Sequence, residues 1–323
     1  MIIGSIKETN VNETRSAITP AMVKSYTKFG FKVILESKIG DKSFISDQEF
    51  LDSDAEIVPT AQEVYNKSDI IIQVNPISID EIDKLKDGTL FISLIQTTKE
   101  IEFVKTLTQK NVSAISMHLI PRSTIAQKMD ALSSQSNIAG YKAVLSGAMH
   151  IGKYMPLLMT AAGTIPPAKV VVIGAGVAGL QAIATAKRLG AQVEASDVRP
   201  EVKEQVESLG AKYIEVKSDS NDGVGEGGYA KETSDEYKQK QQELLAQHIA
   251  KSDIVITTAL IPGRPAPILI PKSMVENMSA GSVIIDLAAE NGGNCELTQT
   301  DKVINHDGVI IDGTANIPAT MPI

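Results

Sequence analysis

The residues VVVIGAGVAG, at positions 170–179, join a run of valine and isoleucine to a glycine-rich turn. The alanine-rich stretch LQAIATAKRLG (180–190) follows directly and has the pattern of a helix. A strand, a Gly-x-Gly-x-x-Gly turn and a helix in this order are the fingerprint of a dinucleotide-binding Rossmann unit. Gly174 permits the tight turn, Gly176 lets the backbone approach a pyrophosphate, and Gly179 allows close packing of the helix on the strand. The alternative is a glycine turn without a ligand.

The next expected strand, QVEASD (192–197), ends in Asp197, 18 residues after the last glycine of the turn. A carboxylate at this place accepts hydrogen bonds from the ribose hydroxyls of the adenosine and repels a 2′-phosphate. The sequence therefore predicts NAD(H) as the cofactor in preference to NADP(H). Arg199 argues the other way, because a nearby arginine can accommodate the 2′-phosphate.

Short aliphatic runs alternate with helical patterns along the chain, which indicates an α/β fold with parallel sheets. A helix is expected over 20–30, with Thr19 as its cap and Pro20 at its first position. A long helical pattern starts near Ser133 and runs to about Ala162. Strands are expected at 32–37, 69–74, 89–95, 113–117, 169–176, 192–197, 212–216, 253–259, 282–288 and 308–313.

The runs SDIIIQVNP (68–76) and SDIVITTALIP (252–262) echo each other, one in each half of the chain. This echo, together with a length of 323 residues, indicates two domains with similar wiring rather than one core. The sequence predicts two Rossmann-like domains with parallel sheets flanked by helices, at 1–132 and 133–317. The long helix joins them, a cleft lies between them, and the tail 318–323 returns to the first domain.

The composition excludes several classes of function. A net charge of −8 argues against nucleic acid as a partner. Cys295 is the single cysteine, so an internal disulfide is excluded, and no run of 18 apolar residues could span a membrane. The four histidines do not cluster with carboxylates or with the cysteine, so no metal site is expected.

The chain shows no pattern for covalent catalysis and no obvious acid–base pair beside the cofactor fingerprint. His118 could approach the cofactor, although a structural role is the favoured alternative. Direct hydride transfer between two nicotinamide rings exchanges no proton, so it has no need of acid–base groups.

A glycine-rich loop, DSNDGVGEGGYAKE (219–232), carries one aromatic residue, Tyr229. It runs into a capping box from Thr233 to Glu236, so its far end is anchored on a helix. It is either a surface connection or a loop that closes over a bound cofactor.

The segment PRSTIAQKMDALSSQSNIAGYKAV (121–144) resembles the signature loop of the NAD(H)-binding component of proton-translocating NAD(P) transhydrogenases. This component is domain I of the alpha subunit, in the alanine dehydrogenase/transhydrogenase superfamily. ETRSAITP (13–20), TALIPGRPAP (258–267) and DLAAENGGNCELT (286–298) agree with the same family, and the resemblance covers essentially the whole chain.

The resemblance implies an enzyme in which hydride passes directly from NADH to NADP⁺, coupled to proton movement across a membrane. This chain would bind NAD(H) and form a homodimer. NADP(H) would be bound by a partner component that is attached to a membrane-spanning proton channel. The chain would be cytoplasmic and peripheral on the inner face of the cytoplasmic membrane, held there by its partner subunits.

The resemblance also assigns roles to individual residues. The catalytic residues would grip the nicotinamide half of NAD(H) and fix its distance from the second ring, and they are Arg122, Gln127, Asp130 and Ser133. The other cofactor-binding residues, besides the three glycines of the turn, are Val177, Asp197, Val198, Arg199, Gly228, Tyr229, Gln241 and Leu260. For Gln241, a solvated helix face is the alternative.

Two rival functions remain open. Alanine dehydrogenases share the ETRSAITP opening with Arg15, but they have a substrate-binding lysine where this chain has Asn75 and a catalytic histidine where it has Ile95. The other rival is an NAD-binding module without turnover. The chain also departs from the transhydrogenase pattern after TANIPATMPI (314–323), where the family continues with helical structure, and it has Ala319 and Thr320 where an arginine is usual.

Overall fold

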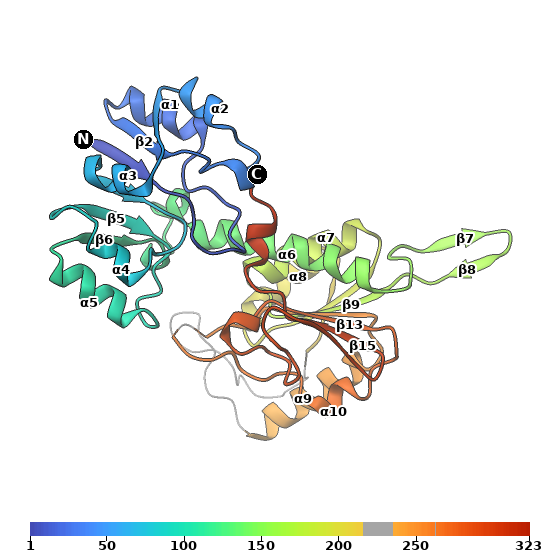
Figure 1. Ribbon diagram of the computed structural model, residues 1–323. Coiled ribbons are helices and arrows are strands. Elements are labelled where there is room, and N and C mark those ends of the chain that lie inside the picture. The colour runs from blue at the N-terminus through green and yellow to red at the C-terminus, as the bar shows by residue number, and fades with distance from the viewer. Residues whose placement is uncertain (216–234, 262) are drawn as a thin grey trace. The chain divides into compact units, whose positions relative to one another are not determined.

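The computed structural model of the protein describes residues 1–215, 235–261 and 263–323, without the side chains of residues 235–238. The chain folds as two compact units (Figure 1). The first unit comprises Met1–Ser134 and Pro318–Ile323, and the second comprises Gln135–Ile317. The division falls in the first turn of the long helix α6 (Ala131–His150).

The first unit contains a six-stranded parallel sheet in the order β3-β2-β1-β4-β5-β6. Its strands are β1 (Ile2–Ser5), β2 (Lys32–Glu36), β3 (Ala55–Val58), β4 (Ile70–Ile72), β5 (Leu90–Ser93) and β6 (Ser113–Ser116). Its helices are α1 (Pro20–Lys28), α2 (Asp47–Leu51), α3 (Ala61–Lys67), α4 (Ile79–Ile82) and α5 (Ile101–Gln109). Thr19 caps α1 with Pro20 in its first turn, as predicted. The sequence pattern misses β1 and β3, because each has four residues and an exposed glutamate interrupts β3.

The second unit contains a seven-stranded sheet in the order β11-β10-β9-β12-β13-β15-β14. Its strands are β9 (Lys169–Ile173), β10 (Gln192–Ser196), β11 (Lys212–Tyr213), β12 (Ile254–Thr257), β13 (Val283–Asp286), β14 (Val303–His306) and β15 (Val309–Asp312), of which β14 is antiparallel to β15. Its helices, besides most of α6, are α7 (Val177–Arg188), α8 (Lys203–Ser208), α9 (Asp235–Ile249) and α10 (Lys272–Val275).

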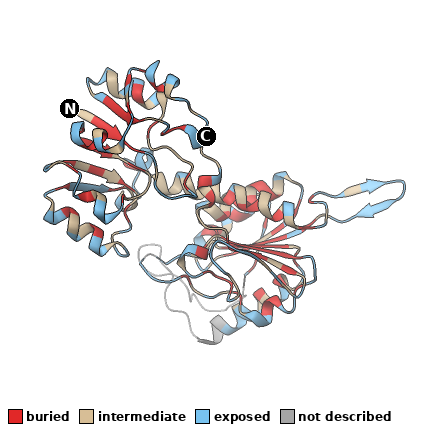
Figure 2. Cartoon of the chain, in the orientation of Figure 1, coloured by how far each residue is buried: buried red, intermediate tan, exposed pale blue. Residues whose placement is uncertain are grey.

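Helices cover both faces of each sheet, so the strands are buried and aliphatic, as Figure 2 shows by colour. In the second unit, alternate residues of β9 point to opposite faces. Val170 and Val172 belong to the core that includes α6 and α7, whereas Val171 and Ile173 belong to the core that includes α9 and α10. In the first unit, α3, α4 and α5 cover one face and α1 and α2 cover the other.

The two sheets share one wiring. In each, the second and third strands lie on one side of the first strand, and the fourth and fifth lie on the other. The echoed sequence runs form β4 and β12, and each of these pairs with the first strand of its own sheet. This 3-2-1-4-5 order is that of the Rossmann fold, so the predicted α/β fold with two Rossmann-like domains is confirmed.

The prediction that the long helix runs to about Ala162 is wrong. The helix α6 ends at His150, and the chain then forms an antiparallel hairpin from β7 (Leu158–Thr160) and β8 (Gly163–Ile165). Pro156 cannot continue a helix, and Gly163, with a φ of 143°, suits the turn of the hairpin. Strands of three residues are too short to show alternation, so the sequence pattern resembled a helix.

The remaining regular elements are short 3-10 helices, namely Asp41–Ser43, Met117–Leu119, Gln127–Met129, Pro200–Val202, Ala289–Asn291 and Ile317–Thr320. Within the part of the chain that the structure describes, no helix has the length and apolar character needed to cross a membrane.

Candidate functional site

The glycine turn between β9 and α7 requires glycine at two of its three positions. Gly174 has a φ of 95°, which residues with a Cβ rarely adopt. A Cβ on Gly179 would collide with the carbonyl oxygen of Gly174, so only glycine lets α7 start this close to the strand. Gly176 is different, because a Cβ there would meet a single atom within 4 Å, a guanidinium nitrogen of Arg199 at 4.0 Å. The backbone at Gly176 is therefore open on that side, next to the N-terminus of α7.

Asp197, at the end of β10, points its carboxylate at this turn. It accepts hydrogen bonds from the amide of Ala175 (2.6 Å), the amide of Arg199 (2.9 Å) and the Nε and Nη2 atoms of Arg199 (both 3.0 Å). Burial would raise the pKa of Asp197, but the hydrogen bonds from Arg199 and Ala175 outweigh it and lower the pKa below its usual value. The carboxylate is thus ionised, and Arg199 is its ion-pair partner.

Two residues of this region escape the sequence reasoning. The hydroxyl of Tyr213 donates to the carbonyl of Asp197 (2.7 Å), which fixes the backbone beside the carboxylate. The hydroxyl of Thr258, directly after β12, donates to the carbonyl of Gly174 (3.1 Å). Neither has a sequence signal, because each is an ordinary strand-end residue whose partner is set by the sheet order.

Three of the predicted contact residues are exposed aliphatic side chains around the turn. Val177 follows β9, Val198 follows β10 and Leu260 follows β12, and all three are exposed. These strands are neighbours in the sheet, in the order β10-β9-β12. Exposed aliphatic residues at adjacent strand ends form a surface that a flat apolar ring can cover.

Four predicted residues lie between β6 and the first turn of α6. Asp130 is the residue before α6, and its Oδ1 accepts from the Ser133 amide (2.9 Å) while its Oδ2 accepts from the Ser133 hydroxyl (2.6 Å). Asp130 therefore caps the helix. These bonds from Ser133, together with the positive charge of Arg122, lower the pKa of Asp130. The structure brings Asp130 and Ser133 together, and it leaves Arg122 and Gln127 exposed on the preceding segment.

The same segment carries large apolar side chains that face solvent. Ile125 is 93% exposed, and Leu119 and Met129 are also exposed. Exposed apolar residues that lie close together in a chain mark an interaction surface more often than isolated ones do.

A buried polar cluster surrounds Arg15 in the first unit. Both carboxylate oxygens of the fully buried Glu13 accept from the Arg15 guanidinium, each at 2.7 Å. The Asn75 amide nitrogen donates to Glu13 (2.9 Å) and to Glu8 (3.1 Å). Burial would raise the pKa of Glu13, but its hydrogen bonds from Arg15 and Asn75 lower the pKa to about 2. Ile95 is buried in the hydrophobic core.

The remaining predicted residues are placed as follows. Gly228 and Tyr229, with the glycine-rich loop and the start of its capping box, lie outside the described residues. Gln241 is half-buried on α9. The last turn of that helix is tied to the sheet by His248, whose Nδ1 lies 2.5 Å from a carboxylate oxygen of Glu194 on β10. Among the described residues, no group of histidine, cysteine, aspartate and glutamate could hold a metal ion.

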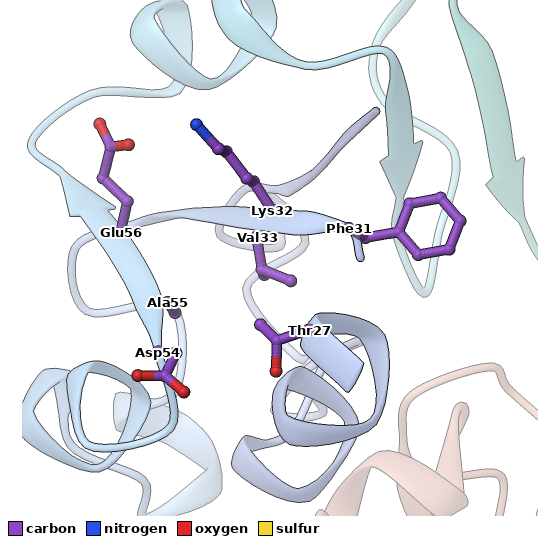
Figure 3. Close-up of a pocket in the computed structure, with 7 residues that line it drawn as sticks. All are labelled: Thr27, Phe31, Lys32, Val33, Asp54, Ala55 and Glu56. Atoms are coloured by element: carbon purple, nitrogen blue, oxygen red, sulfur yellow. The ribbon is translucent and has the colours of Figure 1, made fainter. Parts of the chain in front are cut away.

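A surface cavity of about 350 Å³ in the first unit lies away from these residues (Figure 3). It is found where β2 and β3 begin, whereas ligands of open α/β sheets bind at the carboxyl ends of the strands. It therefore has no part in the candidate site. It is lined by Thr27, Phe31, Lys32, Val33, Asp54, Ala55 and Glu56.

Comparisons with known proteins agree with this geometry. Residues 4–139 match the N-terminal domain and residues 143–323 the C-terminal domain of the alanine dehydrogenase/PNT family. The chain is 46% identical to the first of the chains that make up NAD(P) transhydrogenase subunit alpha in Rhodospirillum rubrum, over 99% of this chain and 85% of that one. It is 30% identical to the alanine dehydrogenase of Methanococcus maripaludis, over 99% of this chain and 82% of that one.

The crystal structure of a transhydrogenase from Sinorhizobium meliloti superposes with a TM-score of 0.89 at 42% identity, covering 100% of this chain and 89% of that one. The similarity to the transhydrogenase thus exceeds the similarity to the alanine dehydrogenase along the same length of chain. The chain therefore belongs to the alanine dehydrogenase/PNT family, and within it to the NAD(P) transhydrogenase alpha subunits.

Proposed function

We propose that this chain is the NAD(H)-binding component of a proton-translocating transhydrogenase, and that hydride passes directly between the nicotinamide it holds and that of NADP(H) on a partner component. The observation that carries the proposal is the Asp130–Ser133 cap. It fixes polar groups of the transhydrogenase signature at the start of a helix, with two charge-assisted hydrogen bonds. Groups held this rigidly suit a reaction whose rate depends on the position of a ring.

The glycine turn is the proposed site for the diphosphate and adenosine part of NAD(H). The open side of Gly176 and the free amides at the start of α7 fit a pyrophosphate. Asp197 would accept hydrogen bonds from the adenosine ribose once the Arg199 guanidinium moves from the carboxylate, and Val177 and Val198 would cover the adenosine. The negative charge of Asp197 favours NAD(H) over NADP(H).

The bound cofactor supplies or accepts the hydride, and the protein supplies position. In the proposal, Arg122, Gln127, Asp130 and Ser133 hold the nicotinamide half. Leu260 lies at the strand end on that side of the turn. Gly228, Tyr229 and Gln241 complete the cofactor contacts. Proton movement belongs to the partner components.

Exposed apolar residues support the proposed partners. Leu119, Ile125 and Met129, on the segment that bears Arg122, would be covered by the NADP(H)-binding component. That component would hold this chain at the inner face of the cytoplasmic membrane.

The hairpin β7–β8 supports a homodimer. Met159 is 71% exposed, Leu157 and Ile165 are exposed as well, and residues 154–168 carry no charge. Figure 2 shows the hairpin as a mostly exposed arm. A two-stranded hairpin is marginally stable alone in water, and an uncharged arm on an acidic chain suits contact with a second copy, because like charges do not oppose it.

The alanine dehydrogenase alternative is opposed by the cluster around Arg15. Glu13 occupies the guanidinium that would bind a substrate carboxylate, and a second carboxylate would have to displace it. Asn75 is engaged with Glu13 and Glu8, and Ile95 is a core residue that offers no acid–base group.

The test mixes the protein with an NADP(H)-binding transhydrogenase component and follows hydride transfer from NADPH to an NAD analogue. Ser133→Ala and Asp130→Asn should each lower the transfer rate about tenfold or more, while the NADH dissociation constant changes by less than about threefold. Ser25→Ala, which removes a hydroxyl bonded within α1, is the matched control and should leave both unchanged. Tight NADH binding without transfer would favour a non-catalytic NAD-binding module, and alanine-dependent reduction of NAD would favour an alanine dehydrogenase.

A further inference from the structure

A buried carboxylate organises the segment that follows β13. Asp286 is fully buried, where a charged group is costly unless hydrogen bonds satisfy it. Five donors at 2.6–3.0 Å surround its two oxygens, namely the hydroxyls of Thr257 and Thr298 and the amides of Ala288, Asn294 and Cys295. The backbone of residues 286–298 is therefore wrapped around a single ionised side chain, which places Asn294.

Asn294 in turn holds the segment that follows β12. The residue is fully buried, and its side-chain oxygen accepts from the Ala259 amide (3.0 Å). Its side-chain nitrogen donates to the carbonyls of Ala259 (2.9 Å) and Pro267 (2.8 Å). The amide thus binds Ala259 on both its polar groups, as a neighbouring strand would, and it also holds the far end of the segment.

The held segment touches the glycine turn. The Thr258 amide donates to the carbonyl of Ile173 (2.9 Å), and the Thr258 hydroxyl donates to the carbonyl of Gly174 (3.1 Å). A Cβ on Gly174 would collide with that hydroxyl. Ala259 is bonded to Asn294 and is followed by the exposed Leu260, so Asn294 determines where Leu260 stands beside the turn.

The sheet order indicates which half of a dinucleotide this segment meets. Asp197 ends β10, on one side of β9, whereas Leu260 follows β12, on the other side. In Rossmann folds the dinucleotide crosses the sheet where the strand order reverses, which is between β9 and β12 here. With the adenosine ribose at Asp197, the distal nucleoside lies on the β12 side.

We propose that Asn294 is a positioning residue that holds Ala259 and Pro267 so that Leu260 faces the nicotinamide nucleoside of NAD(H). The proposal rests on the proposed function only in that the chain binds NAD(H) with its adenosine at Asp197. Asn294 touches no part of the cofactor and acts through the backbone that it holds.

The test compares two ligands on one variant. For Asn294→Ala, the dissociation constant of NADH should rise about tenfold or more, because three hydrogen bonds to the segment are lost, whereas that of 5′-AMP, which fills the adenosine side alone, should stay within about twofold. A general loss of structure would weaken both ligands together. Asn277→Ala is the matched control, because that amide makes one bond to the carbonyl of Ser273 on the surface helix α10, and both constants should be unchanged.

Two further variants keep the proposal falsifiable. If Asn294→Ala does not fold, Asn294→Asp preserves the size and the acceptor while it removes the donor to the carbonyls of Ala259 and Pro267, and it should show the same split. Leu260→Ala, at an exposed position, should also weaken NADH alone, and combining it with the Asn294 variant should cost less than the sum of the two. Equal weakening of NADH and 5′-AMP, or no change in either, would overturn the proposal. No NADH binding by the unaltered protein would instead refute the proposed function.

Discussion

The helix α6 crosses the first turn of α7 at Gly140, and this contact sets the most demanding prediction. A Cβ on Gly140 would lie 2.8 Å from the carbonyl carbon of Ala178 and closer still to its oxygen, whereas ordinary contacts begin at 3.4 Å. In Gly140→Ala, one helix must therefore retreat by about 0.6 Å or more. The atoms in the way are backbone, so no side-chain rotation can relieve the overlap.

The expected cost follows from two opposing effects. Overpacking of a close helix contact costs about 1–3 kcal/mol, and replacing glycine by alanine inside a helix returns about 1 kcal/mol. The net loss should be about 1–2 kcal/mol of the free energy of unfolding. Ala178 lies between Val177 and Gly179, in the turn whose amides are proposed to bind the pyrophosphate. The NADH dissociation constant should therefore rise about tenfold, which is equivalent to about 1.4 kcal/mol.

Urea unfolding and NADH fluorescence titration measure the two effects, with two matched glycine variants. In Gly147→Ala the new Cβ meets side-chain carbons of Ile254 at 3.0, 3.2 and 3.7 Å, which can adjust, so the effect should be small. In Gly152→Ala it meets nothing within 4 Å, so no change in binding is expected. Wild-type stability and NADH affinity in Gly140→Ala, or equal effects in all three variants, would refute the reasoning.

Two further predictions concern charged side chains. Because the folded-state pKa of Glu13 is lowered to about 2, its contribution to the free energy of unfolding is present above the ordinary carboxyl pKa and is lost as the pH falls toward 2; it is on the order of 3 kcal/mol. Urea unfolding from pH 7 to pH 2 should therefore show a weaker pH dependence for Glu13→Gln than for the wild type, and identical profiles would contradict this. Asp197→Asn removes the charge that repels a 2′-phosphate and releases Arg199, so the preference for NADH over NADPH in competitive titrations should fall about tenfold, and an unchanged preference would show that Asp197 does not discriminate.

Much of the fold follows from local sequence patterns. The glycine turn, the helix cap at Thr19 and Pro20 and most strands were predictable, because each depends on the steric and hydrogen-bonding needs of residues a few positions apart. The pattern failed where it was too short or too uniform to carry a period. The hairpin after α6 is apolar throughout and was expected to be helical, and the four-residue strands β1 and β3 were missed.

The candidate site divides in the same way. Sequence resemblance named Asp197, Asp130 and Ser133, and the cap between the last two is a local contact. It did not name the residues that hold the site in place, because their partners are far apart in the chain. Thr258 bonds to Gly174, 84 residues away, and Asn294 bonds to Ala259, 35 residues away.

The sequence by itself determined that a dinucleotide turn, two similarly wired halves and a polar helix start are present, because turns, caps and strand periods depend on neighbouring residues. Only the tertiary structure decided that Arg199 occupies the carboxylate of Asp197, that Glu13 and Asn75 enclose Arg15, and that Asn294 holds the strand end beside the turn. These pairings arise when the order of parallel strands brings distant side chains to one edge of a sheet, and that order depends on the packing of the whole core.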